Sequence, residues 1–303
     1  MAQPTITTTY AGQFAGEYIG AALLSGNTLA NQLITIKPNI KLKEVIKKVD
    51  YASSIAAGSC DFTSAGTVTL TERILQPDEL QVNLELCKTP FQSDWEAESM
   101  GFSAHDSLPT KFSDFFIARI SADVAQGTEQ RIWGADGFTG LFADAAFGTD
   151  GGTTIAPAAV DADNVVGELG KVVDAINSNL YGKEDLFIYV SQNIWRAYKR
   201  ALGGFQANGV GANGFDQRGN NQDIDIQYFD GVKLVVANGL ADDRMVAAEK
   251  TNLFFGTGLL NDQNEVKVLD MADIDGSKNV RFVMRYTAGV QYGIASDIVY
   301  YGA

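Results

Sequence analysis

The residues that could carry out acid–base, nucleophilic or metal chemistry are few in this sequence. Its one histidine, His105, leaves a single candidate base to activate a serine or cysteine nucleophile. His105 stands in MGFSAHDSLPT, just before a predicted helix, where a polar residue near a helix cap is the simpler interpretation. Cys60 and Cys87 lie far apart without further ligands, which argues against a zinc site.

Motifs that bind phosphate groups or pair carboxylates for catalysis are also missing. The sequence contains no GxxxxGK[ST] loop and no GxGxxG after a strand, and the glycine-rich run VGANGFDQRGNN lacks the closing Lys-Ser/Thr. The acidic pairs Asp161/Asp163 and Asp242/Asp243 lie in turn-like contexts, where solvated caps are the better interpretation. We therefore predict no catalytic residue, no cofactor and no metal, and hence a protein that is not an enzyme.

Composition limits the class of protein further. The chain of 303 residues is 46% hydrophobic, so it can build a sizeable core. It has 23 Lys and Arg residues against 37 Asp and Glu residues, and its net charge of −14 predicts only weak binding to DNA phosphates. The opening MAQPTITTTY is no signal peptide, no apolar run is long enough to span a membrane, and two cysteines make no disulfide scaffold. These features predict a soluble protein in a reducing compartment.

A long helix is predicted between about residues 107 and 133. Asp106 or Ser107 can cap its start, Pro109 suits its first turn, and Gly134 follows its end. At ~1.5 Å per residue such a helix would be roughly 37 Å long, which is unusual in a compact domain. Its predicted core row repeats at i,i+4 spacing: Phe112, Phe116, Ile120 and Val124.

Two strands precede this helix, and the turn-rich stretch QPDE at 76–79 separates them. Their apolar residues alternate with polar ones: Val68, Leu70, Val82, Leu84 and Leu86. We expect the strands to pair as a projecting hairpin over about residues 52–89, which needs another surface because an isolated hairpin is marginal in water. Five lysines before it form either a solvated face or a contact for an acidic neighbour: Lys37, Lys41, Lys43, Lys47 and Lys48.

A second structured region follows a linker-like stretch rich in Ala, Gly and Asp. It contains a predicted helix over about 164–182, a buried strand in DLFIYV and a further helix in QNIWRAYKRAL. The Gly- and Asn-rich loop 203–222 is long enough to be functional or mobile. Asp230-Gly231 predicts a hairpin turn, and NEVKVLDM predicts another strand. The fold class is therefore α+β.

The stretch from Val280 to Ala303 alternates large apolar residues with polar or small ones. The alternation continues for about three times the usual length of a strand. It predicts one long, gently bending strand with one buried face.

In this order of elements the chain resembles the major capsid proteins of tailed bacteriophages, which have the Hong Kong 97-type fold. The likeness covers essentially the whole chain and includes RIWGADGFTGLF, LFIYVSQNIWRAYKRAL, DGVKLVVANGLADDRMVAA and RFVMRYTAGVQYG. It implies an N-terminal arm, an extended loop hairpin, a peripheral domain with a long spine helix, and an axial domain. It also implies that the terminal strand packs its apolar face on the long helix. The implied bounds are 1–50 for the arm and the start of the peripheral domain, 51–90 for the extended loop, 91–150 for the peripheral domain, 151–264 for the axial domain and 265–303 for strands returning to the peripheral domain.

The resemblance also implies a role. The protein would assemble with itself, as hexamers and pentamers, into the icosahedral shell around a double-stranded DNA genome. It would be made in the host cytoplasm, contact portal, scaffolding or decoration proteins, hold the packaged DNA only weakly, and have no membrane contact. The implied extended-loop contacts are Phe62, Val68, Glu72, Arg73, Asp78 and Glu79. The implied axial-loop residues are Gly209, Gly211 and Asn213, and the implied spine-helix core is Phe112, Phe116, Ile120 and Val124.

Two other interpretations are open at this point. A non-viral nanocompartment shell with the same fold would have the same sequence features. A soluble α+β enzyme with a site in the second region would use the Gly- and Asn-rich loop and the Asp-rich turns, although no convergent acid–base set supports it.

Overall fold

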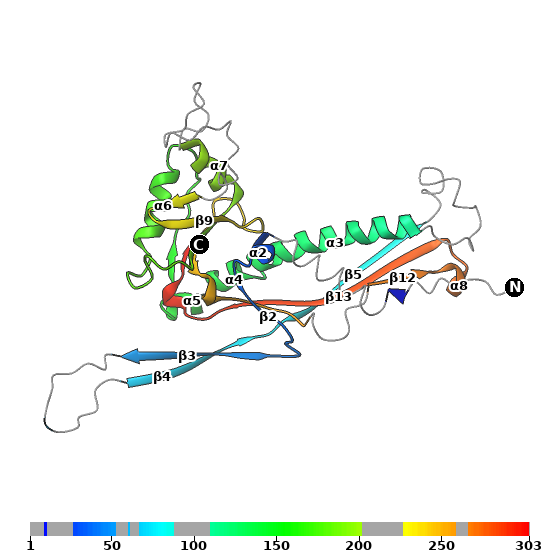
Figure 1. Ribbon diagram of the computed structural model, residues 1–303, viewed down its shortest axis with the longest axis horizontal. Helices are drawn as coiled ribbons and strands as arrows, with labels where there is room; N and C mark the ends of the chain where they lie inside the picture. Colours follow the sequence, from blue (N-terminus) through cyan, green and yellow to red (C-terminus); the bar gives the residue numbers. More distant parts are fainter. Residues whose placement is uncertain are drawn as a thin grey trace.

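The computed structural model describes residues 9–10, 27–52, 60, 67–87, 110–201, 227–258 and 266–302. Within these ranges the chain forms two six-stranded sheets, here called sheet I and sheet II, and a separate two-stranded hairpin. Figure 1 shows an elongated molecule in which sheet I runs along a long helix, sheet II lies at one end, and the hairpin extends away from both.

Sheet I is built around one long strand, β13. Its strands in spatial order are β1 (Thr9–Tyr10), β12 (Val266–Asp270), β13 (Asn279–Tyr292), β11 (Leu253–Gly256) and β2 (Thr35–Lys37), with β5 (Asp78–Cys87) also paired to β13. Along β13, alternate side chains are buried, as period-two strands with one core face require: Val280, Phe282, Met284 and Tyr286. The predicted long strand and its apolar face are therefore confirmed over these 14 residues. The short helix α8 (Ala272–Asp275) joins β12 to β13.

The predicted continuation of this strand beyond Tyr292 is wrong. The side chain of Asn252 receives the Ile294 N–H at 2.7 Å and donates to the Ile294 carbonyl at 2.8 Å, so it replaces a strand partner and ends the ladder. A 3₁₀ turn (Ala295–Asp297) follows, and β14 (Val299–Tyr301) joins sheet II instead. Apolar patterning could not show this change of sheet, because all three β14 residues are buried.

The long helix α3 (Thr110–Trp133) is confirmed, with the Gly134 N–H bonded to the Gln130 carbonyl at 2.7 Å as it ends. Ile120 and Val124 are buried in the same core as the inward side chains of β13, which confirms the predicted packing of this strand on the helix. The side chains of Phe112 and Phe116 lie outside the described part of the chain, so their place in the core row stays a prediction.

Sheet II carries two helices on one face. Its strands in order are β6 (Thr153–Ile155), β14, β10 (Met245–Glu249), β7 (Leu186–Val190), β9 (Val232–Val236) and β8 (Gln227–Phe229). Helices α6 (Val165–Asp174) and α7 (Gln192–Ala201) pack against each other and share one apolar core with these strands. Helix α6 ends at Asp174, earlier than expected, yet Ile176 and Leu180 beyond it remain buried.

The turn between β8 and β9 is the predicted hairpin turn. Asp230 has φ 48° and Gly231 has φ 81°, the pair of positive values that a type I′ turn requires. Because these primed turns match the twist of the flanking strands, the Asp-Gly dipeptide fixes the register in which Phe229 lies opposite Val232.

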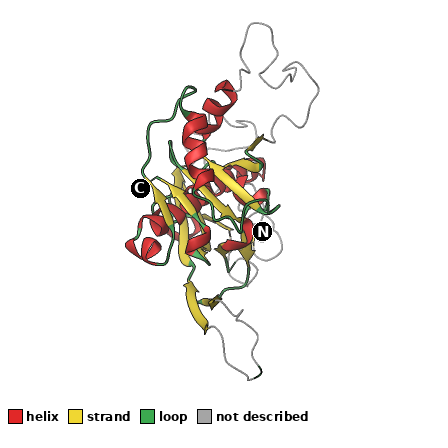
Figure 2. Cartoon of the chain, turned by 90° about the vertical axis from the view of Figure 1, so that its left-hand side faces the viewer, coloured by secondary structure: helices red, strands yellow, loops and turns green. Residues whose placement is uncertain are grey.

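A bridge of aromatic side chains joins the two sheets. Helix α2 (Asn27–Ala30), α4 (Phe138–Ala143) and α5 (Ala145–Thr149) lie between them, with a 3₁₀ turn (Lys250–Asn252) connecting β10 to β11. The Phe142 ring lies 5.8 Å from Tyr292 of sheet I and 5.5 Å from Tyr300 of sheet II, measured between ring centroids. The Trp133 ring lies 4.9 Å from the Tyr189 ring of sheet II, with the two ring planes tilted by 42°. One face of each sheet therefore belongs to the same buried core. Figure 2 shows helices around the strands and the hairpin extending away from them.

The hairpin differs from its prediction. The strands before and after residues 76–79 do not pair with each other: β4 (Thr67–Leu75) pairs with β3 (Glu44–Ala52), while β5 pairs with β13 over ten residues. Gln76-Pro77 is a crossing and not a turn, because the chain runs on from the hairpin into sheet I (Figure 1). Gly289 of β13 makes room for this crossing, since a Cβ there would lie 2.7 Å from the Gln76 carbonyl oxygen.

Candidate assembly surfaces

One face of the β3–β4 hairpin is apolar and exposed. Val45 lies opposite Ile74 in the register, and residues 68, 70, 72 and 74 share a face because successive side chains alternate, so that Glu72, opposite Lys47, lies between the apolar residues. Val68 is 61% exposed, Leu70 66%, Ile74 48% and Val45 44%. We call these four apolar residues the apolar hairpin face. Their exposure makes this face a candidate contact site.

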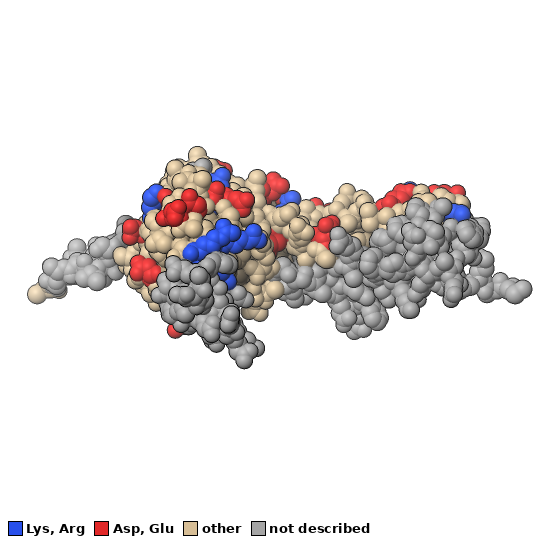
Figure 3. Space-filling model, turned by 90° about the horizontal axis from the view of Figure 1, so that it is seen from above, with Lys and Arg blue, Asp and Glu red and all other residues tan. Residues whose placement is uncertain are grey.

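The hairpin also carries positive charge. Lys41, Lys43 and Lys47 are exposed, and no carboxylate in the described ranges forms an ion pair with them, although Glu72 lies opposite Lys47 in the register. Lys37, by contrast, is paired with Glu44. On the face of the molecule seen in Figure 3, acidic side chains are dispersed and basic ones gather in a few patches. The lysines of the hairpin therefore suit an acidic neighbour.

The hairpin is fastened to the body at Arg73, near the end of β4. The Arg73 Nε donates to the Gly293 carbonyl at 3.1 Å, and its guanidinium forms an ion pair with Asp150. The same group lies 4.0 Å above the centre of the Tyr292 ring. Arg73, predicted as a contact between subunits, is thus held by its own chain.

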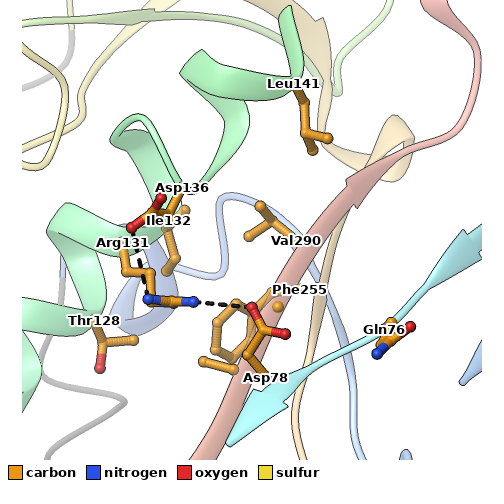
Figure 4. A pocket seen from close by; sticks show the side chains of 11 residues that line it. Gln76, Asp78, Thr128, Arg131, Ile132, Asp136, Leu141, Phe255 and Val290 are labelled. Carbon is orange, nitrogen blue, oxygen red and sulfur yellow. Dashed lines mark hydrogen bonds and ion pairs between the residues drawn. The ribbon is translucent and has the colours of Figure 1, made fainter. Parts of the chain in front are cut away.

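Asp78 and Glu79 begin β5, where the chain enters sheet I. Asp78 forms an ion pair with Arg131 of α3 at 2.9 Å, and the Arg131 guanidinium also lies 3.8 Å from Asp136 (Figure 4). Glu79 lies 3.8 Å from Arg285, with both side chains largely exposed. Asp78 is therefore also engaged within the chain. Val68 and Glu72 remain exposed on the hairpin, so their contact role stays a prediction.

A pocket of about 130 Å³ opens beside Arg131. Figure 4 shows Asp78 and Asp136 on either side of the guanidinium, with Val290 and Phe255 behind it. The charged groups beside this pocket form a small ion-pair network, in which the Arg131 guanidinium faces the two carboxylates. In the described ranges, no three or more His, Cys, Asp or Glu side chains are grouped so that they could hold a metal ion.

A buried carboxylate lies where the amino-terminal segment, α3 and sheet II meet. Glu129 of α3 is 4% exposed; it accepts the Thr28 N–H at 3.1 Å and the Thr28 hydroxyl, which in turn accepts the Trp133 Nε1–H at 2.8 Å. Burial raises the pKa of the Glu129 carboxyl, against hydrogen bonds from Thr28, Gly239 and Trp133 that lower it. We call Glu129, Thr28, Trp133 and Gly239 the joint.

Sequence reasoning missed the joint and the partners of Arg73. A signal for the joint was present, since Thr128 and Glu129 interrupt the apolar row that runs from Val124 to Ile132. Several predicted residues lie outside the described ranges: Phe62, His105, Gly209, Gly211 and Asn213. Cys60 and Cys87 are exposed and form no disulfide. Within the described ranges, no helix has the length and apolarity needed to cross a bilayer.

Comparison with known proteins gives a likeness of structure alone. No family model matches the sequence, and no curated protein matches it. The structure resembles one described as the capsid of a native GTA particle, with 14% identity, 100% of this chain and 96% of the other covered, and a TM-score of 0.57. It also resembles a satellite phage P4 procapsid structure, with 11% identity, 100% and 92% coverage and a TM-score of 0.59.

A third similar structure is a virus-like particle from Pyrococcus furiosus, with 9% identity, 95% and 97% coverage and a TM-score of 0.55. At such low sequence identities the likeness shows that the chains follow a similar path in space. It assigns no role to individual residues. The match extends over nearly the full length of both chains in each case, so it includes sheet I, sheet II and the hairpin together. The chain therefore has the fold of phage major capsid proteins.

Proposed function

We propose that this protein is a major capsid protein that assembles with itself into the icosahedral shell around the double-stranded DNA of a tailed phage. Its role would be structural and not enzymatic, and its location would be the virion. The fold it shares with capsid structures supports this proposal. The observation that carries it is the apolar hairpin face, which a single copy leaves exposed to water.

The energetics of the hairpin favour a second copy as its support. A two-stranded hairpin is marginal by itself, and its apolar face has nothing to rest on within the described chain. Covering a half-exposed Val, Leu or Ile contributes about 1 kcal/mol, so four such residues contribute a few kcal/mol per copy. A closed ring repeats that gain at every interface, because head-to-tail contacts recur around the symmetry axis.

The elements take roles in this proposal as follows. Helix α3 is the spine, sheet I is the peripheral domain, and sheet II with α6 and α7 is the axial domain. The extended loop is the β3–β4 hairpin, residues 44–75, which replaces the range inferred from sequence. The predicted axial-loop residues Gly209, Gly211 and Asn213 lie outside the described ranges.

Other partners follow from the same role. Portal, scaffolding or decoration proteins would contact the shell, and packaged DNA would contact it weakly and without sequence preference. The net charge of −14 supports the weak contact, because DNA phosphates repel an acidic wall.

A nanocompartment shell is the second candidate. The similarity to the structure from Pyrococcus furiosus favours it, because that structure is described as a virus-like particle and not as a phage capsid. The contents of the particle separate the two functions. Nuclease-resistant, genome-length DNA in particles from phage-producing cells supports the capsid, whereas an enclosed protein cargo without DNA supports the nanocompartment.

Electron microscopy and light scattering of the purified protein test the proposal directly. We expect closed particles of uniform size, and monomers at all concentrations would contradict it. Leu70→Gln, on the apolar hairpin face, should reduce assembly at least tenfold, whereas Thr71→Gln on the opposite face should not. Both variants should keep the circular dichroism spectrum of the parent, because neither residue is in the core.

A further inference from the structure

Arg73 stands where β4 leaves the body. On the paired strand β3, Lys48 lies opposite Thr71, and its charge also acts on Asp297 of the body. On the body side of Arg73, Leu75 is fully buried and the Gln291 Nε2 donates to the Ile74 carbonyl at 3.0 Å. On its outer side, Val68, Leu70 and Glu72 are exposed. The Arg73 side chain is therefore the outermost link from β4 to the body within the described ranges.

Three contacts act on this one side chain in different directions. The Gly293 carbonyl accepts from Nε in the guanidinium plane, the Asp150 carboxylate pairs with a terminal nitrogen, and the Tyr292 ring covers the flat face at 4.0 Å. A planar group held at its edge, at its end and on its face cannot rotate without losing one of them. The side chain is only 24% exposed, so solvent screens these contacts less than it screens a surface ion pair.

We propose that Arg73 sets the angle at which the hairpin leaves sheet I, and that it is thereby a positioning residue for the contact between copies. The second half of this inference rests on the proposed shell function, and the first half does not. The hairpin acts as a lever whose fulcrum is the crossing at Gln76-Pro77, where Pro77 and Gly289 replace a regular ladder.

The length of the lever makes the angle matter. From Arg73 to Thr67, six residues at ~3.3 Å each give a reach of about 20 Å. A rotation of about 10° at the base therefore moves the end of β4 by about 3.5 Å, which is nearly the full distance over which two apolar side chains remain in contact. The apolar hairpin face would then lose its contact with the next copy, even though its own residues are unchanged.

The two native cysteines measure this angle. Cys60 lies in the connection between β3 and β4, Cys87 ends β5 in sheet I, and both are exposed. Spin labels on this pair report the distance from hairpin to sheet by pulsed electron resonance. The doubly labelled chain is diluted into Cys60→Ser/Cys87→Ser protein, so that each distance arises within one copy.

Arg73→Lys is the decisive variant, because it keeps the charge and loses the planar group. Arg285→Lys is the matched control, an arginine on the neighbouring strand β13 that is 61% exposed and only 3.8 Å from Glu79. We expect Arg73→Lys to shift the mean distance by about 3 Å or to broaden its distribution, as the lever arithmetic gives. Arg285→Lys should leave the parent distribution in place. Equal distributions in the two variants would overturn the proposal.

Particle shape and thermal stability complete the test. Arg73→Lys should produce open, irregular or size-heterogeneous assemblies. Its melting temperature should equal that of Arg285→Lys. Asp150→Asn removes the ion pair alone, so it serves as a second variant with an intermediate effect. Regular particles from Arg73→Lys would refute a positioning role in assembly. If the parent protein forms no particles, the shell function fails, and the spin-label distances still decide whether Arg73 sets the angle.

Discussion

Glu129 and Ile120 lie on the same helix, but the sequence alone predicts the burial of Ile120 and not the partners of Glu129. Ile120 could be predicted, because i,i+4 apolar spacing on α3 is a local signal. The partners of Glu129 and Arg73 could not, because Thr28, Asp150 and Gly293 are far away in sequence. Contacts of that kind depend on a finished fold. The sequence marks Glu129 only as an interruption of the apolar row and does not identify its partner Thr28.

Ile120→Asp tests the predicted core row. Ile120 is 7% exposed, so an unpaired carboxylate there costs several kcal/mol, a large part of the ~5–15 kcal/mol that stabilises a typical domain. We expect little soluble folded protein, or a melting temperature lowered by more than ten degrees. Gln126→Asp, at an exposed position of the same helix, is the control and should melt within two degrees of the parent. Equal melting of the two variants would place Ile120 outside the core.

Glu129→Gln tests the joint through pH. Burial raises the folded-state pKa of this carboxyl above its unfolded value, so the native state holds the proton more tightly. The contribution of Glu129 to stability therefore rises as pH falls through the raised folded pKa toward 4.5, its ordinary value, and is lost as pH rises. Chemical denaturation from pH 7.5 down to the ordinary value of 4.5 should show this gain in the parent and a smaller gain in the variant. Glu79→Gln, largely exposed, is the control and should follow the parent.

At the scale of elements, the strands were predictable and their pairing was not. Alternation identified β4, β5 and β13 because each shows one face to the core or to solvent. The pairing of β4 with β3 was missed because Gln76-Pro77 has the composition of a turn, and only the position of Gly289 shows that the chain crosses β13 there. The loop 203–222 lies outside the described ranges, and so do all three predicted axial-loop residues within it.

Gly289→Ala tests that crossing. A Cβ at position 289 would lie 2.7 Å from the Gln76 carbonyl oxygen and 2.8 Å from the Pro77 Cα. Both are backbone atoms, so they can move only if the chain around them moves too. We expect a loss of 1–3 kcal/mol, about what overpacking costs in a core, by urea denaturation. Gly127→Ala on α3 is the opposite control, since its Cβ meets nothing within 4 Å. It should stabilise the protein by about 0.5–1 kcal/mol through helix propensity. A loss of stability would contradict an open, helical environment at position 127.

At the scale of the whole molecule, sheet I and sheet II are joined because residues of both sheets pack in one buried core. Aromatic rings from α3, α4, β7, β13 and β14 make the connection: Trp133, Phe142, Tyr189, Tyr292 and Tyr300. The joint adds polar links across the same boundary, with Gly239 packed so closely on α3 that a Cβ would lie 2.0 Å from the Glu129 carbonyl oxygen. The order of elements along the chain predicted two regions, but nothing local in the sequence showed that they share a core.

Phe142→Ala tests the continuity of that core. Phe142 is 1% exposed and touches rings of both sheets, so its loss should cost about 3–5 kcal/mol. Calorimetry of the unassembled parent should show one transition, and the variant should show a lower, broader or divided one. Leu141→Ala, a half-buried neighbour, should shift the midpoint without changing the shape. Two separate transitions in the parent would mean that the sheets unfold independently.

The position of β13 has a consequence for synthesis on the ribosome. This strand pairs with β5 on one side and with β12 and β11 on the other, yet it emerges after all of them. Until it leaves the exit tunnel, β5 and the hairpin attached to it have no sheet to join, and the inward face of α3 has no cover. A nascent chain therefore cannot complete sheet I while β13 is still inside the tunnel. Because the strand that joins the sheet follows its partners in the chain, the packing of sheet I on α3 forms only after all of those partners have emerged.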